Sequence, residues 1–212
     1  MLAAEVLRPG LLEGTSVLVA GTTEPVAPLG VAVSEACTEL GAHVQMCAPV
    51  AAEEAIVDEL VIAAVAECGS LDLLVVDGAG LFTHGIADIG DARAALRICL
   101  DATWNVTRAV VNLAFLGAEP SSSDRPGSGS PTRRIVYLAP ASDAGEHAGA
   151  ARAGLENLAR TLSIEWARHG ITLVTIAPGE VTAAGEVAAL TAYIASPAGA
   201  YFSGCLLDLG GG

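Results

Sequence analysis

Four polar residues stand together in the second half of the chain, within the segment Ser142-Asp143-Ala144-Gly145-Glu146-His147. An imidazole beside a carboxylate is a pairing that serves general acid–base catalysis, because histidine exchanges protons near neutral pH. Asp143, Glu146 and His147 are therefore candidate acid–base residues. The alternative is a solvated polar loop that caps a helix starting near Ala148. We favour the loop, since proximity along a sequence says little about geometry.

A longer pattern surrounds this segment, over residues 145–179. It predicts a long helix at 148–169, then a strand, and then Ile176-Ala177-Pro178-Gly179. This succession resembles the short-chain dehydrogenase/reductase (SDR) family closely. The resemblance covers nearly the whole chain, and it implies the Rossmann-like fold of an NAD(P)-dependent oxidoreductase.

The residues that carry out the family's chemistry are replaced at the matching positions. The family begins this helix with Tyr-x-x-x-Lys, in which the tyrosine donates a proton and the lysine lowers its pKa. The same register here gives Ala148 and Arg152, while Pro140 and Cys99 match the family's serine and asparagine. An alanine has no proton to give, and the sequence contains no lysine. The resemblance is therefore to a degenerate, FabG-like member of the family that lacks the catalytic tetrad.

The loop that binds the cofactor phosphates in the family is altered as well. The family has Thr-Gly-x-x-x-Gly-x-Gly, whose glycines let backbone N–H groups approach a pyrophosphate. Here residues 20–30 read AGTTEPVAPLG, so Gly21, Thr22 and Gly30 remain as a vestige. Two prolines remove N–H donors, and a glutamate adds negative charge where an anion would lie. We expect an ordinary turn and no bound cofactor.

Other parts of the family's binding site are also replaced or missing. Asp77-Gly78-Ala79-Gly80 stands for the family's Asn-Asn-Ala-Gly, and we expect it to keep the turn but lose the side-chain contact to the neighbouring strand. Cys47 and Ala48 stand where an acidic residue would bind a ribose hydroxyl. A β-α unit that walls the adenine pocket is absent between residues 47 and 51, and so is the substrate lid after Pro178-Gly179.

The elements that position these residues alternate between strands and helices. This alternation predicts an α/β, doubly wound, Rossmann-like parallel sheet in a single domain, residues 1–212. Six strands are expected, at 15–20, 43–47, 71–76, 134–138, 172–177 and 205–209. Helices are expected at 29–40, 51–68, 91–116 (whole or broken), 148–169 and 186–195. Residues 117–132 are rich in glycine, proline and serine, which predicts a flexible surface loop.

Composition limits the remaining function classes. The formal net charge is −14, so no basic surface is expected and nucleic acid is an improbable partner. No apolar run has the length of a membrane span, and the N-terminus does not resemble a signal peptide. The five cysteines are widely spaced, which suggests reduced core thiols of a cytoplasmic protein and no metal ligands.

Three hypotheses for function follow from these observations. The preferred one is a catalytically inactive structural or partner subunit. It would assemble with an SDR-family subunit, either itself or an active ketoreductase or dehydrogenase, through helices 91–116 and 148–169 and the region 186–212. The second is a cofactor-independent enzyme that uses the remodelled cleft. The third is an NAD(P)-dependent reductase with a rearranged site.

Overall fold

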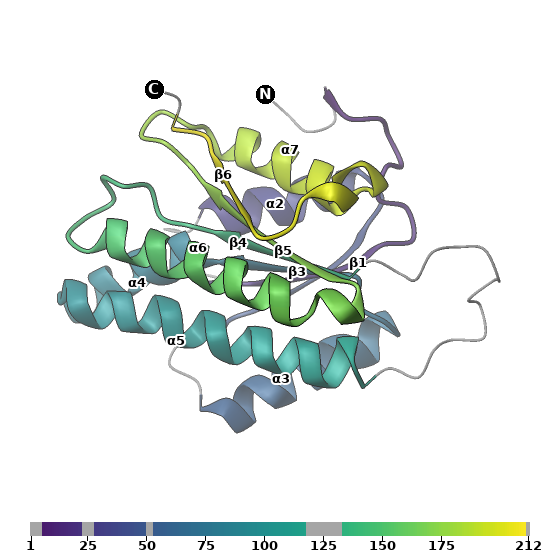
Figure 1. Cartoon of the computed structure of the whole chain (residues 1–212), viewed down its shortest axis with the longest axis horizontal. Helices are drawn as coiled ribbons and strands as arrows, with labels where there is room; N and C mark the ends of the chain where they lie inside the picture. The colour runs from purple at the N-terminus through teal and green to yellow at the C-terminus, as the bar shows by residue number, and fades with distance from the viewer. Residues whose placement is uncertain (1–5, 23–27, 50–52, 118–132, 211–212) are drawn as a thin grey trace.

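The computed structural model describes residues 6–22, 28–49, 53–117 and 133–210 (Figure 1). Residues 23–27, the middle of the phosphate-loop segment that the sequence singles out, lie outside the described residues. So does nearly all of the loop that the sequence predicts to be flexible, residues 118–132.

Six parallel strands form one sheet in the order β2-β1-β3-β4-β5-β6. The prediction of a doubly wound α/β sheet of six strands is confirmed. The strands are β1 (Ser16–Ala20), β2 (His43–Cys47), β3 (Leu73–Asp77), β4 (Arg133–Leu138), β5 (Ile171–Ala177) and β6 (Cys205–Asp208).

The strand order shows where the sheet is shorter than the usual doubly wound arrangement. In the order 3-2-1-4-5-6, a third strand lies outside the second. Here β2 is the edge strand, and β3 pairs with β1 on the opposite side from β2. Between β2 and helix α3 (Glu54–Cys68), the described residues contain no further strand. This arrangement agrees with a β-α unit missing after Cys47.

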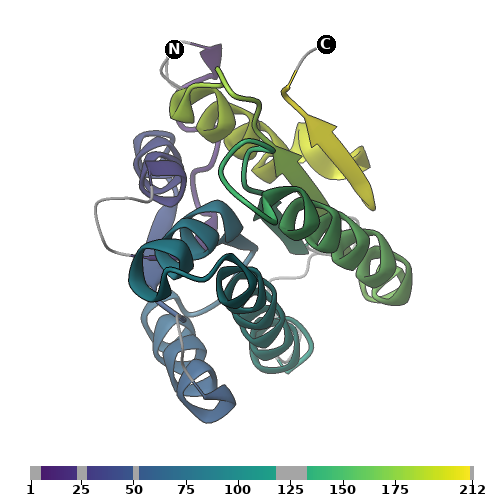
Figure 2. The same ribbon diagram turned by 90° about the vertical axis from the view of Figure 1, so that its left-hand side faces the viewer.

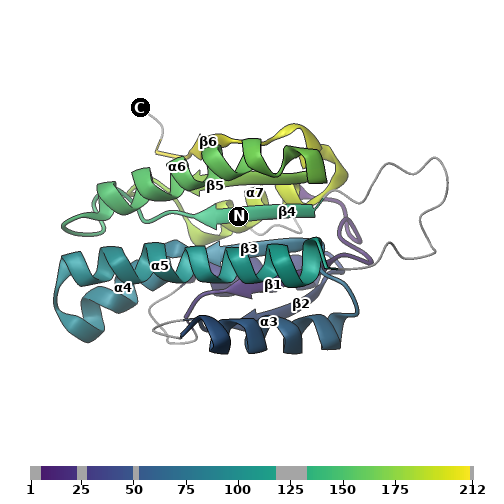
Figure 3. The same cartoon turned by 60° about the horizontal axis from the view of Figure 1, so that its bottom comes forward.

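Helices cover both faces of the sheet (Figure 2). Helices α2 (Pro28–Glu39) and α7 (Ala184–Ala195) pack on one face. On the other face lie α3, α4 (Gly78–Ile89), α5 (Ala92–Val110) and α6 (Ala148–Glu165), of which α3, α5 and α6 lie side by side in Figure 3. Alternate strand residues enter the two cores, which is why the central strands read as unbroken apolar runs.

One helix was not predicted from the sequence. A turn was expected at residues 77–80, whereas α4 starts at Gly78 and continues to Ile89. Glycine weakens helices, and two glycines stand in the first turn of α4, so the sequence pattern hid it. The Asp77 carboxylate accepts the Gly80 N–H at 2.8 Å and caps the helix start. The expected simple turn is therefore wrong.

Helix boundaries also differ in detail from those expected. The helix expected at 91–116 is not broken: α5 passes at Val111 into a π-helical turn that ends at Phe115. The helix expected at 148–169 ends as α6 at Glu165, and a short 3-10 turn follows. Helix α7 begins two residues early, at Ala184, because the Glu186 side chain accepts the N–H of the residue before the helix at 3.0 Å.

Candidate functional site

The candidate site lies at the carboxyl ends of the strands, where open α/β sheets bind ligands. Two clefts flank the turn at residues 179–182, which follows β5. The smaller, of about 280 Å³, has mostly apolar walls, contributed by Leu29, Ala79, Pro140, Ala141, Ala144 and Pro178 among others. The larger, of about 460 Å³, is more polar and includes Ser142, Arg152, Glu180 and Asp208.

Three of the four tetrad positions hold side chains that pack or line a wall. Ala148 is fully buried at the start of α6, and Pro140 follows β4 in the wall of the smaller cleft. Cys99 is buried in α5, where its thiol donates to the Gly78 carbonyl at 3.3 Å. Burial, and secondarily the nearby Asp77, raises the pKa of this thiol to about 12. Cys99 is therefore a neutral thiol at physiological pH.

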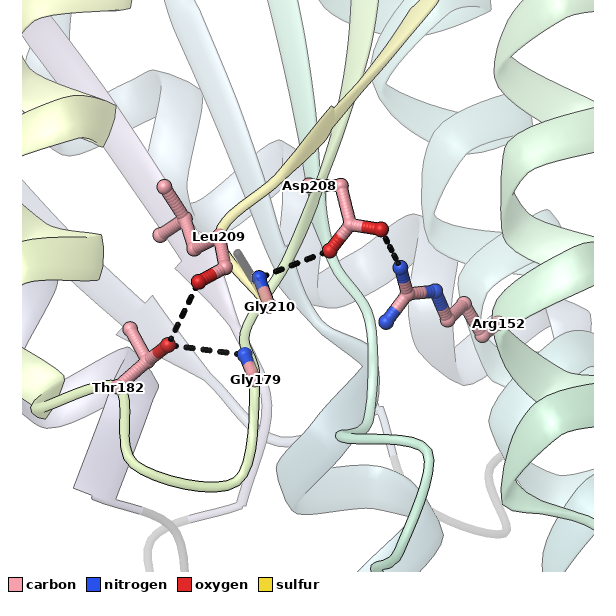
Figure 4. Close-up of polar contacts among 6 residues, drawn as sticks. All are labelled: Arg152, Gly179, Thr182, Asp208, Leu209 and Gly210. Carbon is pink, nitrogen blue, oxygen red and sulfur yellow. Dashed lines mark hydrogen bonds and ion pairs between the residues drawn. The ribbon is translucent and has the colours of Figure 1, made fainter. Parts of the chain in front are cut away.

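Arg152, which the sequence comparison matches to the family's lysine, has a partner in this structure. Its Nη2 lies 2.5 Å from Oδ2 of Asp208 at the end of β6 (Figure 4). The Arg152 side chain is 17% exposed and that of Asp208 is 51% exposed, so the ion pair sits on the wall of the larger cleft. The positive charge is directed toward β6.

The turn at 179–182 begins at the glycine of Pro178-Gly179, after which the sequence predicts that the family's lid is missing. The Gly179 N–H donates to Thr182 Oγ1 at 2.9 Å, and that hydroxyl donates to the Leu209 carbonyl at 3.4 Å (Figure 4). A Cβ on Gly179 would lie 2.5 Å from the Cα of Gly210, which leaves no room for a side chain. The turn at 179–182 therefore contacts Leu209 and Gly210, which follow β6, directly.

Asp77 occupies a buried position between two helix starts. One carboxylate oxygen accepts the Gly30 N–H at the start of α2, and the other accepts the Gly80 N–H at the start of α4, both at 2.8 Å. Neither bond reaches a neighbouring strand, in line with the expected loss of that contact. Burial raises the Asp77 pKa against the opposing effect of these two bonds.

The vestigial glycines pack against this carboxylate. A Cβ on Gly21 would lie 3.0 Å from the Asp77 Cβ, and one on Gly30 would lie 2.9 Å from its Oδ2. Thr22 beside them is also buried. Packing against Asp77 thus accounts for the absence of side chains at Gly21 and Gly30. The Asp77–Gly30 link was missed from the sequence, where the only available signal was an acid directly before a Gly-x-Gly segment.

The candidate acid–base residues lie in a loop before α6. Asp143 and Glu146 are exposed, and His147 is half-buried with its Nε2 3.8 Å from Glu146 Oε1. His147 takes a left-handed backbone conformation, φ 68°, and its side chain makes no capping hydrogen bond to α6. These residues therefore lie in a solvated loop. The sequence interpretation also expected the loop to cap α6, but the His147 side chain makes no such cap.

The described residues show neither a metal cluster nor a membrane-spanning helix. In residues 6–22, 28–49, 53–117 and 133–210, no group of three or more His, Cys, Asp or Glu side chains could hold a metal ion. Over the same ranges, no helix combines the length and apolar character needed to cross a bilayer. The five cysteines are free: Cys37 and Cys99 are buried and the others are half-buried.

Comparison with known structures gives close agreement in fold. The citronellol catabolism dehydrogenase AtuB of Pseudomonas aeruginosa PAO1 is 25% identical, with 96% of each chain covered and a TM-score of 0.72. A short-chain dehydrogenase from Mycobacterium smegmatis is 22% identical over 94% of this chain and 93% of the other, with a TM-score of 0.72. A putative short-chain dehydrogenase/reductase from Burkholderia xenovorans is 19% identical over 95% and 97%, with a TM-score of 0.75.

The sequence also matches a family model. The model described as enoyl-(acyl carrier protein) reductase matches residues 12–185, well over half of the chain. The match begins before β1 and extends into the start of α7, so it includes both helix starts joined by Asp77 and the corner around Arg152. The chain therefore belongs to the short-chain dehydrogenase/reductase family.

Proposed function

We propose that this protein is a catalytically inactive SDR subunit whose role is to assemble with an SDR-family partner, best matched by an active ketoreductase or dehydrogenase. The observation that carries the proposal is the state of the tetrad corner. Where the family needs a proton donor and a free lysine, this chain has the buried Ala148 and the ion-paired Arg152. Neither side chain supplies a transferable proton to a substrate in the clefts.

The cofactor side of the site supports the same proposal. A helix N-terminus favours an anion because its first N–H groups have no partner within the helix, and because the helix dipole places partial positive charge there. At α2 the Gly30 N–H already donates to the buried Asp77 carboxylate. When Asp77 is ionised, its negative charge opposes a second anion at the same helix start. We therefore expect no tightly bound dinucleotide.

Exposed apolar side chains support an assembly role. Trp104 on α5 is 41% exposed and Ile164 on α6 is 76% exposed, on helices that pack against each other. Gly154 makes that packing close, since a Cβ there would lie 2.8 Å from Leu100. Near the other proposed surface, Tyr193 on α7 and Tyr201 just before β6 are also exposed. Tryptophan and tyrosine are enriched among the anchors of protein interfaces.

Co-expression with SDR proteins encoded by neighbouring genes is expected to yield a stoichiometric complex by native mass spectrometry. Trp104→Glu should weaken that complex at least tenfold, because it places a charge in the apolar contact. Ile62→Glu is the matched control, since Ile62 is also an exposed apolar side chain, at 55%, but lies on α3. A protein that stays monomeric alone and beside each neighbour would contradict the proposal, as would equal effects of the two variants.

The second candidate is an NAD(P)-dependent oxidoreductase with a rearranged site. Family membership and the dehydrogenase names of the similar structures favour it. Titration with NADH and NADPH, followed by calorimetry, separates the two candidates. We expect no saturable binding in the micromolar range, while an active SDR run in parallel binds normally. Saturable micromolar binding would favour the reductase and would contradict our interpretation of the phosphate loop.

A further inference from the structure

The last strand, β6, has little support from its own backbone pairing. It has four residues, lies at the edge of the sheet and pairs with β5 alone. Three of its residues are half-buried and the fourth is exposed. Short edge strands of this kind open at low free-energy cost, because few apolar contacts and one row of hydrogen bonds hold them.

An ion pair holds the end of β6 from the side of α6. Arg152 Nη2 lies 2.5 Å from Asp208 Oδ2, and Asp208 Oδ1 accepts the Gly210 N–H at 2.9 Å (Figure 4). The Asp208 carboxylate thus joins residues 208–210, at the end of β6, to α6. The limited exposure of Arg152 reduces the solvent screening that weakens surface ion pairs.

The turn before α7 holds the same segment from the other side. The Leu209 N–H donates to the Ala177 carbonyl at 2.8 Å, and the Leu209 carbonyl accepts from Thr182 Oγ1 at 3.4 Å. Gly179 and Gly210 are in backbone contact. Residues 208–210 are therefore held between α6 and the turn that leads into α7.

We propose that Arg152 is a positioning residue: its ion pair with Asp208 fixes the end of β6 against α6 and thereby sets the β6–α7 surface that a partner subunit contacts. The residue matched to the family's catalytic lysine thus links α6 to β6; we call this Arg152–Asp208 ion pair the brace. The part of this inference that concerns the partner rests on the proposed function; the brace itself does not.

Hydrogen exchange of the amides at 206–210 tests the brace in the whole protein. Arg152→Gln and Asp208→Asn should each raise exchange there by about fivefold or more, because local opening no longer breaks an ion pair. The asparagine keeps an acceptor for the Gly210 N–H, so it removes the charge alone. The double variant should exchange no faster than either single variant. Arg152→Lys should recover part of the protection.

Arg160→Gln is the matched control. Arg160 pairs with Glu156 at 2.7 Å on the same helix, and among the described residues it makes no hydrogen bond or ion pair to β6. It should leave exchange at 206–210 unchanged. Equal exchange in Arg152→Gln and Arg160→Gln would overturn the brace. Asp208 is half-exposed, so its variant is expected to fold and to decide the matter even where Arg152→Gln does not.

The assembly readout is separate. With a partner in hand, Arg152→Gln should weaken the complex, and Arg160→Gln should not. Faster exchange at β6 with unchanged partner affinity would overturn the partner half of the inference and keep the brace. If no complex forms with the unaltered protein, the proposed function fails, and the exchange experiment still decides whether Arg152 positions β6.

Discussion

Replacing Asp77 by alanine is expected to lower the free energy of unfolding by about 2–4 kcal/mol, because it leaves two buried N–H groups without acceptors and opens a small cavity. These groups, on Gly30 and Gly80, begin two different helices. Chemical denaturation monitored by circular dichroism measures the loss. Asp91→Ala is the control: Asp91 caps α5 at the surface through the Arg93 and Ala94 N–H groups. Its loss should cost about 1 kcal/mol.

The Asp77 effect should depend on pH in a stated direction. The folded-state pKa of Asp77 is raised, mainly by burial, so the folded protein binds this proton more tightly than the unfolded chain. The stabilisation linked to that proton is complete below the ordinary aspartate pKa and is lost as pH rises through the raised one. The difference in unfolding free energy between the unaltered protein and Asp77→Ala should therefore shrink as pH increases. A difference that grows with pH would contradict this.

Restoring the family's asparagine at position 78 should destabilise the protein. A Cβ on Gly78 would lie 2.7 Å from a Leu155 methyl and 3.0 Å from the Leu138 carbonyl. The second neighbour is backbone, so relief requires α4 or β4 to move. Overpacking of this kind costs about 1–3 kcal/mol for Gly78→Ala, and Gly78→Asn should cost more. Thermal and denaturant unfolding measure both variants.

Gly149→Ala provides the comparison for Gly78. Gly149 lies near the start of α6, where a Cβ would have no neighbour within 4 Å. Alanine there should stabilise the protein by roughly 0.5–1 kcal/mol, because it reduces the freedom of the unfolded chain. If Gly78→Ala were as harmless as Gly149→Ala, the contact between α4 and α6 would be looser than the structure indicates.

The sheet could be predicted from the sequence mainly because its central strands are buried on both faces. The strands Ser16–Ala20 and Ile171–Ala177 are mostly apolar and end at polar or glycine-containing turns, so their limits were predicted to within two residues. Helix α4 was missed because its first turn contains two glycines, and the cap that starts it is a single carboxylate.

The candidate site residues could be named from the sequence, but the contacts between them could not. The tetrad positions follow from matching the sequence to the family's motif, and their assignment stays a prediction. The two contacts that define the site join residues far apart in the chain: Asp77 to Gly30 across 47 positions, and Arg152 to Asp208 across 56. No local pattern marks such pairs, since they depend on how the strand ends and helix starts meet in space.

The packing at Gly78 also limits which substitutions this position accepts. Leu155 fills the space that a side chain at position 78 would need, and the Leu138 carbonyl closes it from the sheet. An asparagine introduced at Gly78 alone would therefore be unfavourable, and a smaller residue at Leu155 would relieve only one of the two contacts. Introducing the family's residue at this position would need coordinated substitutions, each unfavourable until the others are present.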